Sequence, residues 1–228
     1  MPPDVAKTDS IKLTVDAIVD AAIEVADRDG LDGLSMRRIA DQLGVGAMSL
    51  YRHVADKDTL LQAMAERVGR RHPYPVDDLD VPWRRRVQIA VDIDWELYER
   101  HPWVVVIYSA PRYSYGVDAL EGLDWLAAGF AQLGVDVAEA TSMALTLWNY
   151  VNGVALASVS EQLLRADGPR DRLGGLSDLL AGRTAGTLPY LSSLSAAGGT
   201  QRLTDPRAGL DAGVEYLCAG FEATASGR

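Results

Sequence analysis

The chain has 228 residues, 48% of them hydrophobic and 24% charged, and its formal net charge at pH 7 is −10. This composition supports a packed core and excludes a disordered chain. The negative charge excludes a protein that coats nucleic acid without sequence preference, because that activity depends on positive charge. The only cysteine, Cys218, rules out an internal disulfide and any multi-cysteine metal site, and we expect it to be an ordinary buried residue.

No membrane segment or targeting signal is expected. The longest conspicuous apolar run extends from Trp103 to Tyr108, far short of the roughly 18 residues that span a bilayer. The first residues lack a basic stretch followed by an apolar one, which a secretory signal would need. These features predict a cytoplasmic protein that has no membrane partner.

Helical periodicity dominates from the start of the chain. Apolar residues recur at helical spacing from Val15, and Gly30 is expected to stop this first helix. A second helix should follow Ser35, whose side chain suits an N-cap, and run to Leu43. Gly44 then favours a left-handed turn.

A third, shorter helix and a fourth complete this region. The inward face of the third should hold Ala47, Leu50, Tyr51 and Val54. Asp56 is the expected cap of the fourth helix, over residues 57–71, whose buried side carries Leu60, Leu61, Met64 and Val68. Two short helices joined by a tight turn form a helix-turn-helix, which offers one helix to the DNA major groove.

The segment 72–78 breaks helix and is the best domain boundary. Beyond it, helices are expected near residues 82–100, 102–109, 117–133, 136–166 and 206–224, and the stretch 168–204 is expected to be mainly loop. Val104 to Tyr108 is the one β-prone run. The helix near 136–166 is uncharged from Ala140 to Val159, so we expect it to be buried on nearly every side. The fold class is therefore predicted to be all-α.

Basic residues are concentrated where DNA would bind. Residues 35–57 hold four basic and two acidic side chains, whereas the part after residue 71 holds 12 basic and 20 acidic ones. A small basic patch on an acidic body suits a binder that needs a specific site and is repelled from random DNA.

The N-terminal half of the third helix carries candidate base contacts. Ala47 and Met48 suit a thymine methyl group, and the Ser49 hydroxyl suits most base edges or a phosphate. Arg52 is the strongest candidate for bidentate recognition of guanine, because its guanidinium fork matches O6 and N7.

Four further residues are candidate phosphate contacts. Tyr51, His53 and Lys57 are interpreted as groups that fix the docking register, and Arg37 can reach a phosphate or base at the groove rim. Spacing alone leaves an alternative open, in which Tyr51 and His53 are half-buried residues of a helical packing surface.

The order of residues resembles the DNA-binding domain of TetR-family (tetracycline-repressor-like) regulators over about residues 14–68. The matching motifs are Leu34-Ser35-Met36-Arg37-Arg38-Ile39-Ala40, Leu43-Gly44-Val45, and Ser49-Leu50-Tyr51-Arg52-His53-Val54 followed by Lys57. A weaker resemblance extends into Leu120-Glu121-Gly122-Leu123, Leu133-Gly134 and the final helix. The resemblance implies that the eight candidate residues occupy DNA-contacting positions.

The same resemblance implies two domains and a homodimer. Residues 1–72 would form the DNA-binding domain, with 57–71 as a linking helix, and residues 73–228 the effector-binding and dimerisation domain. Leu210, Val214, Leu217 and Phe221 form an apolar seam interleaved with Gly213 and Gly220. With the 136–166 helix this seam would build a four-helix interface between two subunits, unless it packs only within one subunit.

Aromatic residues predict an effector site in the second domain. All five tryptophans and eight of nine tyrosines follow His72, and a buried helix would hold the amides of Asn149 and Asn152, which need partners. The candidate ligand contacts are Trp95, Trp103, Tyr108, Trp125, Met143, Trp148, Asn149 and Asn152. Tetracycline repressors hold a drug-bound magnesium through a histidine where this chain has Val104 to Ile107, so no metal or cofactor is expected and the effector should be largely apolar.

The sequence therefore predicts a repressor that a small effector releases from a palindromic double-stranded DNA operator. One alternative is a helical ligand-binding dimer that acts as an activator or sensor without repression. Another is an all-helical enzyme, but the chain has no paired histidine motif, glycine-rich phosphate loop or nucleophile elbow. No catalytic residue is expected.

Overall fold

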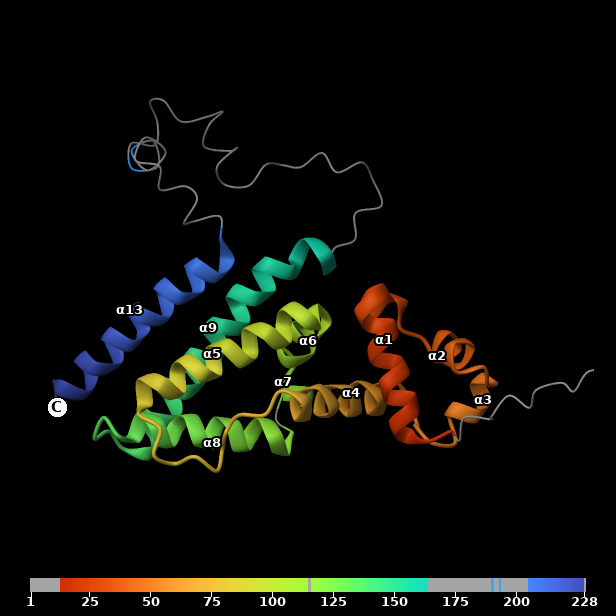
Figure 1. Ribbon diagram of the computed structural model, residues 1–228, viewed down its shortest axis with the longest axis horizontal. Helices are drawn as coiled ribbons and strands as arrows, with labels where there is room; N and C mark the ends of the chain where they lie inside the picture. Colours follow the sequence, from red (N-terminus) through yellow and green to blue (C-terminus); the bar gives the residue numbers. More distant parts are fainter. Residues whose placement is uncertain (1–12, 115, 164–189, 191–192, 194–204, 228) are drawn as a thin grey trace, which may run out of the picture.

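The computed structural model describes residues 13–114, 116–163, 190, 193 and 205–227. The head consists of α1 (Val15–Gly33), α2 (Met36–Leu43), α3 (Ala47–Leu50) and α4 (Lys57–Arg71). The body consists of α5 (Trp83–Arg100), α6 (Pro102–Tyr108), α7 (Pro111–Ser114), α8 (Val117–Ala131), α9 (Val137–Leu163) and α13 (Pro206–Ser226). Figure 1 shows the head at one end of an elongated molecule, with α4 reaching into the body. The all-α prediction is confirmed for the described residues.

The expected helix signals of the head are present. The Ser35 hydroxyl accepts a hydrogen bond from the Arg38 amide at 3.3 Å, and the Asp56 carboxylate accepts one from the Thr59 amide at 2.7 Å. Gly44 has φ 67° and ψ 29°, the left-handed conformation that ends α2. Gly30, at φ 66°, interrupts α1 at the predicted point. Local capping chemistry therefore sets the limits of the helix-turn-helix.

The third helix corrects one expectation. Leu50 and Val54 are buried in the head, but Tyr51, predicted to face inward, is 48% exposed. The reason is the brevity of α3, which ends at Leu50. Leu50 and Val54 lie four residues apart and are buried, and the three residues between them stay on the outer surface.

The helix expected near residues 102–109 is present at the centre of the body. The β-prone run lies in α6, where Trp103, Val104, Val105 and Ile107 are buried. Pro102 at the first turn suits a helix start, because its missing amide proton has no partner there in any case. Close packing of α6 against α1, α5 and α9 overrides the strand preference of its valines. The expected loop over 168–204 falls almost entirely outside the described residues.

The long helix α9 is buried on one face only. Residues at helical spacing along that face pack into the core: Ala140, Met143, Ala144, Leu147, Val151 and Ala155. Asn149 and Gly153 on the opposite side are exposed in the single chain. The expectation of burial on nearly every side is therefore wrong for one subunit, because lack of charge does not require burial.

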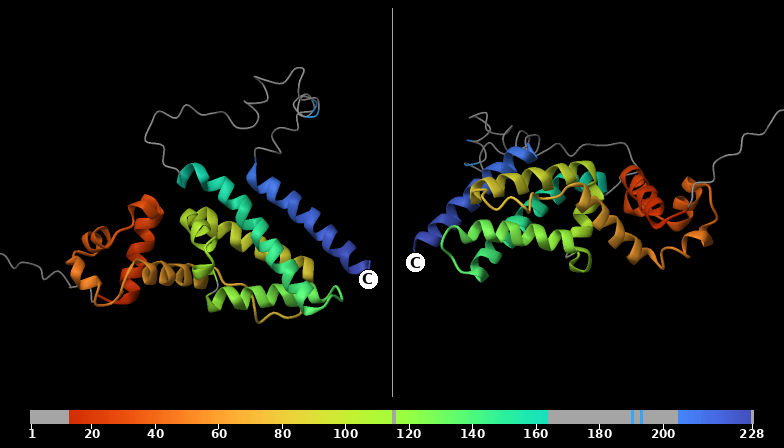
Figure 2. Two further views of the ribbon diagram at one scale, coloured as in Figure 1. Left: turned by 180° about the vertical axis from the view of Figure 1, so that it is seen from behind. Right: turned by 60° about the horizontal axis from the view of Figure 1, so that its bottom comes forward.

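The final helix packs against α9 of its own chain, as the views in Figure 2 agree. Leu210 and Val214 are buried there, and the Phe221 ring lies 5.2 Å from that of Phe130. A Cβ at Gly213 would lie 1.7 Å from the Tyr150 hydroxyl, so this glycine permits the close approach. Leu210, Val214 and Phe221 of the apolar seam thus contact their own chain, and the interface between subunits stays a prediction.

A buried arginine connects three segments of the body. Arg86, 2% exposed, donates to the carbonyl oxygens of Leu79, Val81 and Trp125 at 2.6, 3.0 and 2.5 Å. Its guanidinium lies 4.7 Å from the centre of a Trp125 ring. A Cβ at Gly129 would come within 2.6 Å of the Arg86 side chain, so α8 can accept this arginine only at a glycine. These contacts hold the segment between α4 and α5 against α8.

Among the described helices, none combines the length and the apolar character needed to cross a lipid bilayer.

Candidate functional site

The outer surface of the helix-turn-helix presents cations that no described residue neutralises. Three exposed basic side chains there form no ion pair with any described residue: Arg37, Arg52 and Lys57. Among the described residues, Arg52 donates only to the Ser49 hydroxyl, at 3.3 Å. By contrast, Arg38 on the same helix as Arg37 pairs with Asp29 of α1 at 3.1 Å. The unpaired charges are thus the ones predicted to contact DNA.

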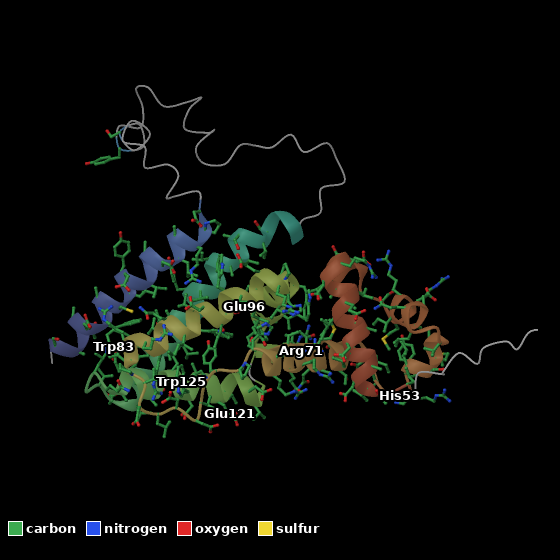
Figure 3. The ribbon with its side chains drawn as sticks, viewed as in Figure 1. His53, Arg71, Trp83, Glu96, Glu121 and Trp125 are labelled. Atoms are coloured by element: carbon green, nitrogen blue, oxygen red, sulfur yellow. The ribbon has the colours of Figure 1, made fainter. Side chains whose placement is uncertain are left out.

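The other predicted DNA contacts lie beside these cations. Met48 is 78% exposed, and Tyr51 and His53 are also exposed. Ala47 and Ser49 are half-buried on α3. Figure 3 shows His53 at the end of the molecule remote from the body. All eight candidates therefore lie within α2, α3, the turn after α3 and the first residue of α4.

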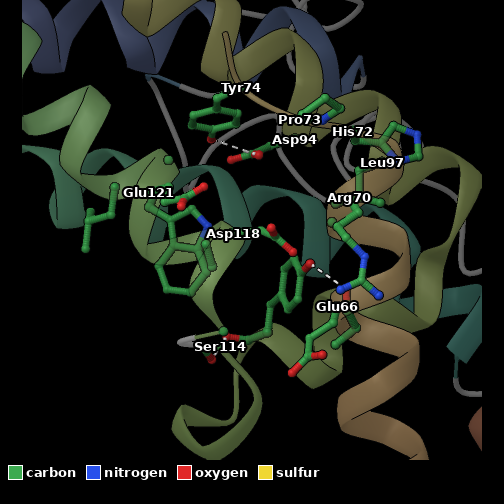
Figure 4. A pocket seen from close by; sticks show the side chains of 18 of the residues that line it. Glu66, Arg70, His72, Pro73, Tyr74, Asp94, Leu97, Ser114, Asp118 and Glu121 are labelled. Carbon is green, nitrogen blue, oxygen red and sulfur yellow. Dashed lines mark hydrogen bonds between the residues drawn. The ribbon is translucent and has the colours of Figure 1, made fainter. Parts of the chain in front are cut away.

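A cavity of about 300 Å³ lies in the body where α4, α5, α6, α7, α8 and α9 meet (Figure 4). Aromatic rings form part of its wall: Tyr74, Tyr108, Tyr113 and Trp148. Its titratable lining also includes Glu66, Arg70, His72, Asp94, Asp118 and Glu121. A concave, largely apolar site with a few polar groups is the usual form of a small-molecule site.

Asp94 is the most deeply buried of these carboxylates. The residue is 8% exposed, and its Oδ1 accepts a hydrogen bond from the Tyr74 hydroxyl at 2.9 Å. Burial raises the pKa of Asp94 to about 7, and the Tyr74 hydrogen bond opposes that rise. Burial also raises the pKa of Tyr74, so its hydroxyl stays protonated and donates.

The sequence identified two residues of this cavity, Tyr108 and Trp148. Trp103 and Trp125 do not line it, and their indole nitrogens donate to Asp27 at 2.6 Å and to the Asp78 carbonyl at 3.0 Å. These two tryptophans have structural partners of their own.

The other four candidate ligand contacts also lie outside the cavity lining. Trp95 and Met143 are buried in the core, and Asn149 is exposed on α9. Asn152 donates to the Ser109 hydroxyl at 2.9 Å, and its Oδ1 is buried without a hydrogen-bonding partner among the described residues. The structure therefore does not bring the eight candidates together.

Asp94 carried a signal that the sequence analysis missed. It lies on α5 at helical spacing from Val87, Val91 and Tyr98, all of which are buried. A carboxylate within the apolar stripe of an amphipathic helix is unusual, because burial of a charge is costly. The position of Asp94 within this apolar stripe indicates the cavity more clearly than the positions of the tryptophans do.

The cavity lies close to the junction between body and head. His72 lines the cavity, and its ring centre lies 6.0 Å from that of His101. His101 Nδ1 lies 2.7 Å from Oδ1 of Asp27, on α1 of the head, and the same oxygen accepts from Trp103. A chain of contacts thus connects the cavity wall to the first helix of the head.

The two regions correspond to a known architecture. Residues 18–64 match the model for the tetR family of bacterial regulatory proteins. The HTH-type transcriptional repressor DrrR1 of Streptomyces coeruleorubidus is 35% identical over 190 residues, which cover 80% of this chain and 69% of DrrR1. An HTH-type transcriptional regulator of Saccharopolyspora erythraea is 33% identical over 213 residues, covering 93% of this chain and 86% of the relative.

A solved structure extends the similarity to the whole fold. The TetR family protein ActR of Streptomyces coelicolor, in complex with actinorhodin, superposes with a TM-score of 0.74 at 26% identity. The match covers 93% of this chain and 96% of ActR. The chain therefore belongs to the TetR family of bacterial regulatory proteins and is a transcriptional regulator, not an enzyme.

Proposed function

We propose that the protein is a homodimeric repressor that leaves its DNA operator when a small effector occupies the cavity in the body. The observation that carries the DNA-binding part is the group of exposed cations on α2, α3 and α4 that lack ion pairs within the described protein. In this proposal Arg52 reads a base, and Lys57 and His53 hold phosphates. Similarity to a named repressor supports repression over activation.

Uncharged surfaces on α9 and α13 support the dimer. Exposed residues along α9 include Ser142, Thr146, Asn149, Gly153, Leu156 and Ala157. Exposed residues along α13 include Ala212, Tyr216, Ala219, Gly220 and Ala223. Two copies that join these faces would bury both helices in a four-helix interface with twofold symmetry. Asn149 would then lie between subunits, not in the effector site.

The contacts between His72, His101 and Asp27 offer a route from effector to DNA. A ligand changes an equilibrium only through its different affinity for the two conformations. We infer that the effector fits a conformation in which the two heads are spaced wrongly for the operator. Tyr108 and Trp148 are the ligand contacts in this proposal.

Selection of bound genomic fragments, followed by mobility shift on the enriched sequence, tests the DNA-binding part. The expected site is a palindrome whose half-site centres lie roughly 34 Å or slightly more apart, bound by two subunits. Analytical ultracentrifugation should show a dimer at micromolar concentration. A monomer at that concentration, or equal affinity for selected and random DNA, would contradict the proposal.

A further inference from the structure

We propose that the cavity is built for an organic cation, an apolar ring system carrying a protonated amine, and that Asp94 pairs with that amine. This inference rests on the proposed function, in which the cavity holds an effector. It adds the chemical class of the effector, which the apolar walls alone do not define.

The charge of the lining is the first reason. Four carboxylate side chains line the cavity, Glu66, Asp94, Asp118 and Glu121, against one guanidinium, that of Arg70. Low-dielectric walls strengthen the field of such groups, and a cleft lined by one sign of charge concentrates ions of the opposite sign. The cavity therefore favours a positively charged guest and disfavours an anionic one.

Incomplete bonding of Asp94 is the second, independent reason. Its only hydrogen bond among the described residues is the one from Tyr74 to Oδ1, and no described cation lies within ion-pair distance. Burying a carboxylate is costly unless it gains a counter-charge and hydrogen bonds to both oxygens. Oδ2 remains available for a donor that enters the cavity, and an ammonium group supplies both the donor and the charge.

Aromatic rings complete the site for such a guest. The Tyr74 hydroxyl orients Asp94, and the rings of Tyr108 and Trp148 lie 6.4 Å apart, centre to centre, in the same wall. Ring faces attract cations as well as flat apolar groups. A neutral apolar effector would use these rings but leave Asp94 unpaired.

A matched series of three anthracenes tests the class directly on the full-length protein. The compounds are 9-(aminomethyl)anthracene, 9-anthracenemethanol and anthracene-9-carboxylic acid, which share a ring but carry a cation, a neutral group and an anion. At pH 8 we expect the amine to bind at least about tenfold more tightly than the alcohol, and the acid to bind most weakly. Titration calorimetry measures the three dissociation constants.

Two variants locate the preference. Asp94→Asn keeps the size of the side chain and an acceptor for Tyr74, and should remove most of the preference for the amine over the alcohol, leaving only the part due to the other three carboxylates. Glu96→Gln removes an exposed carboxylate from the same helix, outside the cavity lining, and should leave the preference unchanged. Leu123→Trp, which fills part of the cavity, should weaken the binding of all three compounds.

Binding of the amine should also depend on pH, because Asp94 must be ionised to pair with it. With an Asp94 pKa of about 7, the affinity should fall about tenfold from pH 8 to pH 6 in the wild type. The other titratable groups that line this space are Glu66, Arg70, His72, Tyr74, Tyr108, Tyr113, Asp118 and Glu121, and Tyr98 outside the lining interacts electrostatically with Asp94. A flat profile in Asp94→Asn assigns the dependence to Asp94 and not to these groups.

Three results overturn the inference: equal or tighter binding of the alcohol or the acid, a preference that Asp94→Asn leaves unchanged, or no binding of any compound at millimolar concentration. Failure of the proposed function has a different signature. If the amine binds with the expected preference but does not release the operator in a mobility shift, the class of ligand stands and the effector role does not.

Discussion

The head and the body treat their charges in opposite ways. In the head, Arg37, Arg52 and Lys57 stand in water without a partner among the described residues. In the body, Arg86 is buried and donates to three carbonyl oxygens, whereas the buried Asp94 has one hydrogen bond with the described residues. In the functions proposed above, exposure does not decide whether a charge serves binding. What decides it is whether the protein itself supplies the partner.

This comparison predicts how substitutions divide between stability and binding. Removal of a satisfied charge should cost stability, whereas removal of an unsatisfied one should cost binding and leave stability equal or higher. Four substitutions test this division, two in the body and two in the head.

The largest effect is expected at Arg86. Arg86→Met keeps much of the volume but leaves the carbonyl oxygens of Leu79, Val81 and Trp125 without their donor, so the free energy of unfolding should fall by about 3–5 kcal/mol. Urea denaturation measures the change. The matched control is Arg85→Met, an exposed neighbour bonded only to Gln88, which should change stability by less than about 0.5 kcal/mol. Equal losses of stability in the two variants would show that the buried hydrogen bonds of Arg86 stabilise the fold no more than the exposed one of Arg85.

The opposite sign is expected at Asp94. Because its pKa is raised to about 7 from an ordinary 3.8, the folded protein loses stability as the pH rises through this range. Asp94→Asn should therefore raise the free energy of unfolding at pH 8, by at most about 4 kcal/mol, and change it little below pH 4. Denaturant unfolding at the two pH values measures the difference. A loss of stability at pH 8 would mean that the protein satisfies this carboxylate after all.

Arg52 should affect recognition without affecting stability. Arg52→Ala is expected to cost about 1–3 kcal/mol of operator binding and to relax the preference at one base pair per half-site. Competition binding against operators substituted at single positions measures both effects. Equal losses on operator and random DNA would indicate that Arg52 contacts phosphate instead.

The smallest effect is expected at Lys57. Lys57→Ala should weaken binding to all sequences alike and reduce the slope of log affinity against log salt by about one. Its thermal unfolding should match that of the wild type, since the lysine has no ion pair among the described residues. A change in sequence preference would assign Lys57 to base recognition.

The head was largely predictable because its determinants are local. Ser35 and Asp56 cap the helices that follow them, and Gly44 supplies a left-handed turn that other residues adopt at a cost. The side chains proposed to face DNA are the ones that remain once the apolar stripe is assigned. The prediction that Tyr51 faces inward was wrong because a one-turn helix has no well-defined inner face.

The cavity was not predictable in the same way, because its residues come from six helices and the segment after α4. Neither helical periodicity nor aromatic content shows which tryptophans line the same cavity. Trp103 and Trp125 are held by Asp27 and a backbone carbonyl, partners that become visible only in the fold. Asp94 could have been found from its position within an apolar stripe.

The shortness of α6 has a consequence for the rate at which a change in the cavity would reach the head. Trp103, at one end of this helix, donates to Asp27 of the head, and Tyr108, at the other end, lines the cavity and donates to the carbonyl of Ala65 on α4. Five residues of helix separate these two side chains by about 8 Å along the axis. So short a rod does not bend, and displacement of one end moves the other as one piece. If the cavity holds the effector as proposed, transmission through α6 requires no local unfolding, and operator release should follow ligand entry on the microsecond to millisecond scale of collective motions.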